Sequence, residues 1–479
     1  MTLKKQAISG AKWTTISMVL VTFFQLGQLS ILARYLQPSD FGLMAIIMVV
    51  IGFSRAFEDM GISNAIIQRP HVTHIQLSSL YWLNLASGLV LTLITLAISP
   101  LLATIYNEPR LQDLMALLSL VFLIVAVGNQ FRVLCQKALR FRAMETVNVI
   151  AAASAFIVAV VSASSGLGVW SLVLAMLTQA IVASMLFLWI GLRNYHKPAL
   201  IYNHRELKGF YGFGLYQMGE RSINYISANV DKLLLGKLVG MGATGFYNMA
   251  WQLIIFPLSK INPIVNKVAF PVYSKVQNDP VALNRYYSFN VKALSIVTMP
   301  LLAFLFFFSH EVVWVVFGEG WDATAELLPA LALVGIMKAL GNPGGAIILS
   351  LGRADVGFWW NVIWASSIVS GLTIGLLISP SAQTAVYVLL GLSLTLGMVW
   401  HVLIARIAKV KYRPIAQHFL KLLVVVMGIG WLGSLLTDLI NLNHALLRIF
   451  IGGFICALLY GLYLYMFEKP IFKMLRRNS

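Results

Sequence analysis

Long runs of apolar residues dominate the chain and limit what it can fold into. Only 11% of its 479 residues are charged, against roughly 25% in a typical soluble domain. Backbone polar groups in hydrocarbon must be paired within the protein, so a run of about 20 apolar residues is expected to cross the bilayer as a helix. Fourteen such runs are expected, over residues 11–35, 41–67, 76–106, 111–135, 143–164, 168–192, 207–238, 243–276, 281–308, 321–351, 354–378, 383–408, 414–438 and 443–467.

Basic residues are concentrated in alternate connections between the runs. Dense examples are segments 132–142, 193–208 and 406–413, whereas intervening loops carry acids such as Glu311 and Glu319. Cytoplasmic loops of membrane proteins are rich in lysine and arginine. The pattern therefore predicts an even number of spans with both termini in the cytoplasm. It also accounts for the net charge of +18 without a nucleic-acid partner.

The longest hydrophilic connection, over residues 193–206, divides the first twelve runs into two sets of six. Residues 1–192 and 207–410 are therefore expected to form an N-terminal and a C-terminal six-helix lobe, joined by this cytoplasmic linker. Residues 411–479 are expected to add two further helices and a basic cytoplasmic tail. The predicted fold is an all-α polytopic membrane protein of fourteen transmembrane helices.

A short sequence similarity links the two predicted lobes. Leu32-Ala33-Arg34-Tyr35-Leu36 followed by Phe41-Gly42 corresponds to Leu235-Gly236-Lys237-Leu238 followed by Gly245-Phe246-Tyr247. Both stretches fall between the first and second helix of a lobe. Since both lobes would start in the cytoplasm, they are expected to be parallel repeats about an axis along the membrane normal.

The sequence shows no machinery for catalysis. It lacks a G-x-x-x-x-G-K-[ST] phosphate-binding loop, and its two cysteines have no metal-ligand neighbours. All external connections are short, which leaves no room for a soluble catalytic domain. We therefore expect neither an enzyme nor a bound metal or cofactor.

The run at 207–238 carries the most informative polar residues. At helical spacing Glu220, Asn224 and Asp231 share one face, and Arg221, Tyr225 and Lys232 form the adjacent stripe. A charge in the bilayer core costs at least about 2.5 kcal/mol on insertion scales, so such residues usually face a water-filled cavity. We expect a cavity wall that binds phosphate or uronate groups. The alternative is local ion pairing of Glu220 with a basic neighbour.

Lysines in two later runs extend this pattern. Lys260 and Lys267 are seven residues apart with Gln252 near their face, and Lys338 lies deep in the tenth run. Lys260 and Lys338 are expected near mid-depth, whereas Lys267 can also reach the inner interface by snorkelling. The deep charges are mainly positive, which favours an anionic ligand held against the C-terminal lobe.

Two earlier runs contain weaker candidates. Arg55, Glu58 and Asp59 lie toward the cytoplasmic end of the second run, where they can form a rim salt bridge or couple transport to an ion at a carboxylate. Thr22 and Gln25 in the first run suit contacts with a sugar, and they equally suit hydrogen bonds between helices.

The N-terminal residues carry a family resemblance. Ala11-Lys12-Trp13, Ala33-Arg34-Tyr35-Leu36-Gln37-Pro38-Ser39-Asp40-Phe41-Gly42, Asp59-Met60-Gly61-Ile62 and Ala65-Ile66-Ile67-Gln68-Arg69 resemble the Wzx-type polysaccharide flippases. These belong to the multidrug/oligosaccharidyl-lipid/polysaccharide (MOP) exporter superfamily, and the chain is similar to the branch of colanic acid and lipopolysaccharide biosynthesis.

The resemblance implies a function. It implies movement of an undecaprenyl-diphosphate-linked oligosaccharide across the bacterial inner membrane by alternating access, alongside the polysaccharide polymerase machinery. It also implies that the last two helices form a lipid groove. One alternative is a drug/cation antiporter of the same superfamily, which predicts an acidic cavity. Another is an integral-membrane polymerase acting on the same sugars.

Overall fold

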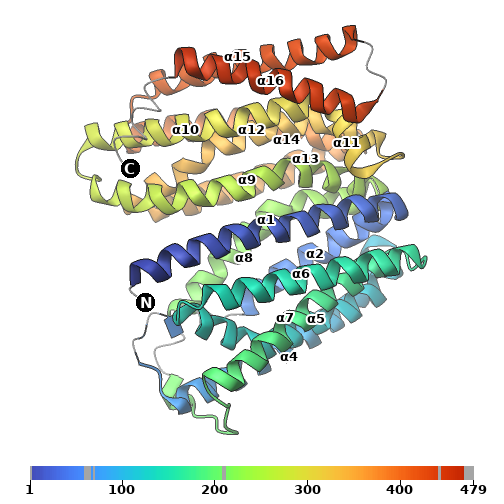
Figure 1. Ribbon diagram of the computed structural model, residues 1–479, viewed down its shortest axis with the longest axis vertical. Coiled ribbons are helices and arrows are strands. Elements are labelled where there is room, and N and C mark those ends of the chain that lie inside the picture. The colour runs from blue at the N-terminus through green and yellow to red at the C-terminus, as the bar shows by residue number, and fades with distance from the viewer. Residues whose placement is uncertain are drawn as a thin grey trace. The chain divides into compact units, whose positions relative to one another are not determined.

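The structure is a computed structural model that describes residues 3–58, 66–67, 69, 71–207, 212–440 and 444–468. All regular structure in these ranges is helical (Figure 1). The long helices are α1 (Leu3–Tyr35), α2 (Pro38–Glu58), α4 (His74–Tyr106), α5 (Arg110–Lys137), α6 (Phe141–Ser164), α7 (Trp170–Asn194), α8 (Gly212–Leu238), α9 (Met241–Lys275), α10 (Pro280–Phe307), α12 (Asp322–Ser350), α13 (Ala354–Ile378), α14 (Ala382–Ile407), α15 (Tyr412–Leu439) and α16 (Ala445–Phe467). Two short elements are η1 (His204–Leu207) and α11 (Ser309–Phe317).

Local sequence signals set several helix ends. Thr73 caps α4 by accepting from the backbone N–H of Gln76, whose side chain accepts from the Thr73 N–H in return. Asp279 caps α10 through the N–H groups of residues 281 and 282, with Pro280 in the first helical position. These contacts satisfy backbone donors that have no partner inside the helix. Short polar motifs in the sequence therefore determine where these two helices begin.

Each of the fourteen predicted apolar runs coincides with one long helix. Within the described residues, twelve of these helices are long and apolar enough to cross a membrane; α8 and α9 are not among the twelve. Both carry the polar residues singled out from the sequence. One detail differs from expectation: residues 309–317, expected as a loop, form α11. The described part of the second run forms α2 as far as Glu58. Residues 59–65 lie outside the described residues.

The chain separates into two compact units, Met1–Gly245 and Phe246–Ser479. In the first unit α5 packs between α4 and α7, α6 packs on α7, and α1 packs on α6. A core of large apolar side chains, including Leu43, Ile47 and Phe122, joins α2, α4 and α5. Helix α8 also belongs to this unit, where it packs against α2.

In the second unit α12 packs against α10 and α14, and α15 packs against α10 and α16. Its core includes the buried side chains of Tyr273, Tyr287, Ile347 and Trp400. The hairpin of α15 and α16 is fixed at one end by Arg448, which pairs with Glu311 of α11 at 3.1 Å and also with Asp438.

The connection between α7 and η1 is held against the first turns of α4. The indole N–H of Trp82 donates to the Ala199 carbonyl at 2.8 Å. The backbone N–H groups of Ala199 and Asn203 donate to the hydroxyls of Ser78 and Ser79, at 3.1 and 3.0 Å. The linker predicted from its hydrophilic sequence is therefore tied to the helix bundle at several points.

Candidate functional site

The polar stripe of α8 is partly described, because the side chains of Glu220 and Arg221 lie outside the described residues. Toward the C-terminal half of the helix, Asp231 is buried and Lys232 is half-buried. The Lys232 ammonium donates to the Asn229 carboxamide at 3.0 Å, and its backbone N–H donates to the Asp231 carboxylate at 2.9 Å. Asn224 is half-buried on the same helix. The described part of the stripe is thus buried or half-buried in the first unit.

Tyr225, which was expected in this stripe, joins α8 to α2. Its hydroxyl donates to the Met48 carbonyl at 2.9 Å. A Cβ added at Gly52 would lie 1.9 Å from the same hydroxyl oxygen, so only glycine fits beneath the ring. This tyrosine fixes the separation of the two helices.

A second close contact lies where α2 and α9 begin. A Cβ at Gly42 would be 1.9 Å from the Met241 carbonyl oxygen, and one at Gly245 would be 1.7 Å from the Pro38 carbonyl oxygen. Cβ atoms do not approach carbonyl oxygens so closely, which makes glycine necessary at both positions. The contact is reciprocal, because each segment places its glycine against a carbonyl of the other. The two segments belong to the similar stretches found by sequence comparison, around Phe41-Gly42 and Gly245-Phe246.

Two lysines of the second unit rest on aromatic rings. The Lys338 ammonium of α12 lies 4.5 Å from the ring centroid of Trp251, a buried residue of α9. The Lys260 ammonium lies 5.6 Å from the ring of Phe256, one turn earlier on α9. In such cation–π contacts the face of the ring attracts the ammonium group. Lys260 and Lys338 therefore contact different rings.

The remaining candidates are more exposed or not described. Gln252, Gln25 and Arg55 are exposed, and Thr22 is half-buried. The side chains of Glu58 and Lys267 and the whole of Asp59 lie outside the described residues, so their predicted roles in coupling, gating and anion binding stay predictions. Helix α1 meets α6 elsewhere, through a hydrogen bond from Thr14 to the Glu145 carboxylate at 3.1 Å.

An apolar cavity of about 480 Å³ lies in the second unit between α10, α15 and α16. Its walls include Val297, Pro300 and Phe304 of α10, Ile429 of α15, and Cys456 of α16. At its edge, the Tyr460 hydroxyl donates to the Ile296 carbonyl at 2.7 Å and fixes α16 to α10. The surroundings suit a hydrocarbon chain and offer little to a polar molecule.

Sequence reasoning missed Tyr225 as a helix contact, Trp251 as a partner of Lys338, and the pairing of Gly42 with Gly245. The repeated glycine in the two similar stretches was a usable signal for the last. No signal in a single sequence indicates which aromatic residue a lysine on another helix will meet.

Comparison with known proteins identifies the class. A family model described as "polysaccharide biosynthesis protein" matches residues 31–326. The lipopolysaccharide biosynthesis protein WzxC of Escherichia coli K12 is 33% identical over 375 residues, which cover 78% of this chain and 76% of that protein. The teichuronic acid biosynthesis protein TuaB of Bacillus subtilis 168 is 32% identical over 430 residues, covering 89% of this chain and 88% of that one.

A solved structure of the lipid II flippase MurJ, in an inward closed conformation, is similar with a TM-score of 0.74 and 14% sequence identity. The match covers 96% of this chain and 100% of that one. The fold is that of transporters of the MOP superfamily. The chain belongs to the polysaccharide biosynthesis protein family of Wzx-like transporters, and it is a multi-pass integral membrane protein, not an enzyme.

Proposed function

We propose that the protein is a flippase of the bacterial inner membrane that moves undecaprenyl-diphosphate-linked, anionic oligosaccharide units for polysaccharide biosynthesis. The observation that carries this proposal is the position of Lys338, between α12 and the buried Trp251 of α9. An ionisable group within a membrane-spanning helix marks a substrate path by default. Membership in a polysaccharide biosynthesis family supports a saccharide cargo.

The lysines act on the head of the substrate. Lys260 and Lys338 present ammonium groups from α9 and α12, and either can bind a diphosphate or a uronate oxygen by a charge-assisted hydrogen bond. Arg221 and Lys267 join this anion site, and Thr22, Gln25, Asn224 and Gln252 contact the sugars. One relative is named for an acidic polymer, teichuronic acid, which agrees with an anionic cargo.

The lipid tail of the substrate needs an apolar path. The cavity between α10, α15 and α16 supplies one in the second unit, lined by Val297, Phe304 and Ile429. The polyprenyl chain occupies this cavity while the charged head passes through the protein. The polyprenyl chain then stays in an apolar environment and the charged head stays in a hydrated one, so neither part is transferred to an unfavourable solvent.

Alternating access requires helix contacts that separate. We place the N-terminus in the cytoplasm, so that the Gly42–Gly245 contact lies toward the outer face. Backbone meets backbone there, without interlocked side chains, so the contact can part without rotamer changes. Opening at this point releases the cargo outward. Arg55, Glu58, Asp59, Glu220 and Asp231 are the residues through which coupling or gating would act.

The alternative functions predict different chemistry. A drug/cation antiporter needs carboxylates in its cavity, whereas the described candidates of the second unit are Lys260 and Lys338. An integral-membrane polymerase needs external catalytic residues, and the described external connections are short.

Export of surface polysaccharide in a strain that lacks its own flippase tests the proposal. Lys338→Ala and Lys260→Ala are compared with Lys275→Ala, an exposed lysine at the end of α9. Loss of a hydrogen bond to a charged group is worth about 1.5–3 kcal/mol, so the Lys338 and Lys260 variants should each lower export roughly tenfold or more. Membrane levels of all variants are measured alongside. Normal export by both the Lys338 and the Lys260 variant would contradict the proposal.

A further inference from the structure

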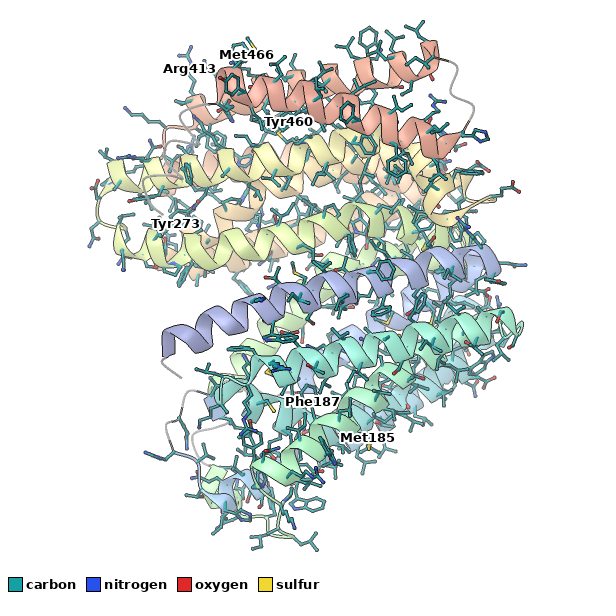
Figure 2. The ribbon with its side chains drawn as sticks, viewed as in Figure 1. Met185, Phe187, Tyr273, Arg413, Tyr460 and Met466 are labelled. Carbon is teal, nitrogen blue, oxygen red and sulfur yellow. The ribbon has the colours of Figure 1, made fainter. Side chains whose placement is uncertain are left out.

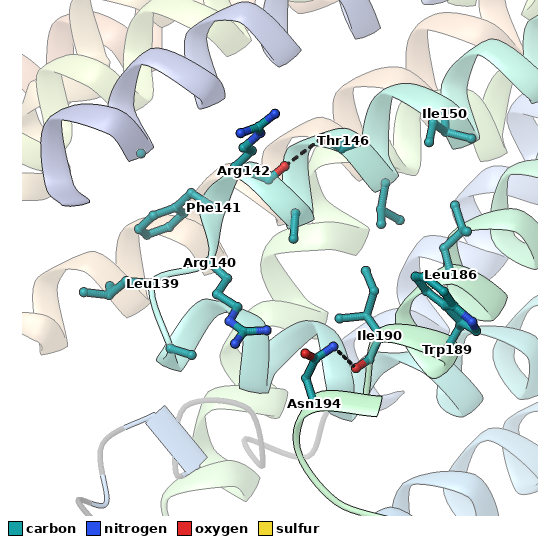
Figure 3. Close-up of a pocket in the computed structure, with 14 residues that line it drawn as sticks. Leu139, Arg140, Phe141, Arg142, Thr146, Ile150, Leu186, Trp189, Ile190 and Asn194 are labelled. Atoms are coloured by element: carbon teal, nitrogen blue, oxygen red, sulfur yellow. Dashed lines mark hydrogen bonds between the residues drawn. The ribbon is translucent and has the colours of Figure 1, made fainter. Parts of the chain in front are cut away.

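A second cavity, of about 780 Å³, lies in the first unit where α5 ends, α6 begins and α7 ends (Figure 3). It is separate from the candidate transport residues and from the apolar cavity of the second unit. Its lining combines three kinds of group: the arginines Arg140 and Arg142, the polar residues Thr146 and Asn194, and an apolar floor that includes Ile190.

The charge of this cavity is wholly positive. No acidic residue is among those that line it. Arg140 lies over the ring of Tyr195 at 5.5 Å and Arg142 over the ring of Trp13 at 4.9 Å. In the described part of the chain neither forms an ion pair with a carboxylate. Figure 3 shows Arg140 extending toward Asn194 and Arg142 extending toward α1.

The apolar floor continues along the outside of the unit. Ile181, Met185 and Trp189 are spaced by four residues on α7 and are 44%, 47% and 56% exposed. Figure 2 labels Met185 on this stripe and Phe187, which is 3% exposed, on the opposite face of the helix. Trp189 also lines the cavity, and Arg193 lies 4.5 Å above its ring. A cationic head site thus leads directly into an exposed hydrocarbon track.

We propose that this cavity binds the phosphate of an anionic glycerophospholipid of the inner leaflet, with the acyl chains along α6 and α7. Basic pockets between membrane helices on the cytoplasmic side recognise such head groups. The basic loops place this end of the unit at the cytoplasmic face. A zwitterionic head would bring its own ammonium against Arg140 and Arg142, whereas a free phosphate would make no use of the apolar track.

Native mass spectrometry of the purified full-length chain, titrated with phosphatidylglycerol or phosphatidylcholine, tests the site. Each arginine near a lipid phosphate contributes about fivefold in affinity. Arg140→Gln and Arg142→Gln should therefore each weaken phosphatidylglycerol binding about fivefold, and the double variant more. Arg413→Gln, at an exposed arginine remote from the cavity in sequence, should bind like the wild type.

A variant that leaves both arginines in place tests whether lipid binding depends on the space in the cavity as well as on its charge. Thr146→Trp fills the cavity without removing an arginine, and it should also lose the phosphatidylglycerol adduct. Equal binding of the two phospholipids, or wild-type binding by the double arginine variant, would overturn the proposal. So would displacement of phosphatidylglycerol by undecaprenyl phosphate at equal concentration, since the site would then belong to the substrate lipid.

Discussion

Gly42 and Gly245 lie against each other's helix: the Met241 carbonyl faces Gly42, and the Pro38 carbonyl faces Gly245. In sequence, 38 precedes 42 by the same interval as 241 precedes 245. Each helix therefore supplies both a glycine and the carbonyl that requires a glycine opposite. The starts of α2 and α9 approach at backbone distance, and no side chain separates them.

Gly42→Ala should destabilise the protein, because its methyl group would lie 1.9 Å from the Met241 oxygen. Overpacking of this kind costs about 1–3 kcal/mol. Thermal unfolding in detergent measures the effect, and export measures whether the contact matters for transport. Gly242→Ala is the matched control, since a Cβ there meets nothing within 4 Å. Equal unfolding temperatures for the two variants would contradict the close contact.

Tyr225→Phe should remove the hydrogen bond from α8 to the Met48 carbonyl and leave the ring in place. Such a bond contributes about 1 kcal/mol, so the unfolding temperature should fall by a few degrees. Tyr387→Phe, at an exposed residue of α14, should have no effect. An unchanged unfolding temperature for Tyr225→Phe would show that the hydroxyl does not hold α8 to α2.

His196 should make the stability of the first unit depend on pH. Burial lowers the pKa of this histidine below its ordinary value of 6.5, and the nearby His74 lowers it further. The unfolded chain therefore binds a proton first as pH falls, and the stability of the neutral form is lost progressively below about pH 6.5. His196→Asn should therefore make the unfolding temperature depend less on pH between pH 7 and pH 5. Replacement of the exposed His444 should leave the profile unchanged.

Arg448→Gln should loosen the α15–α16 hairpin, since it removes the pairs with Glu311 and Asp438. Glu311 is largely shielded from water, so a loss of about 1 kcal/mol is expected, at the upper end for ion pairs near a surface. Hydrogen exchange of α16 measures the change. Arg353→Gln breaks an exposed pair with Asp355 and should leave exchange in α16 unaltered. Equal exchange in both variants would contradict a clamping role for Arg448.

Helix positions followed from the sequence because hydrocarbon leaves the backbone few options. The runs at 354–378 and 443–467 match α13 and α16 closely. Helix α11 was missed because its apolar stretch is too short to cross a bilayer.

The candidate site was less accessible, because side-chain partners on different helices depend on how the helices rotate against one another. Spacing placed Tyr225 beside Lys232 on α8, yet only the packed structure shows it against Gly52 of α2. The partner of Lys338 lies on α9, and helical periodicity carries no information about such a distant residue.

The reciprocal contact of Gly42 and Gly245 has the form of an isologous interface, in which residue i of one partner meets residue j of the other and the reverse also holds. Separate identical subunits make such contacts across a two-fold axis. Here two segments of a single polypeptide form a contact of this kind. Each of the two segments, 38–42 and 241–245, thus carries the same pair of elements, a carbonyl and a glycine four residues later, and a substitution at either glycine disturbs the contact from its own side.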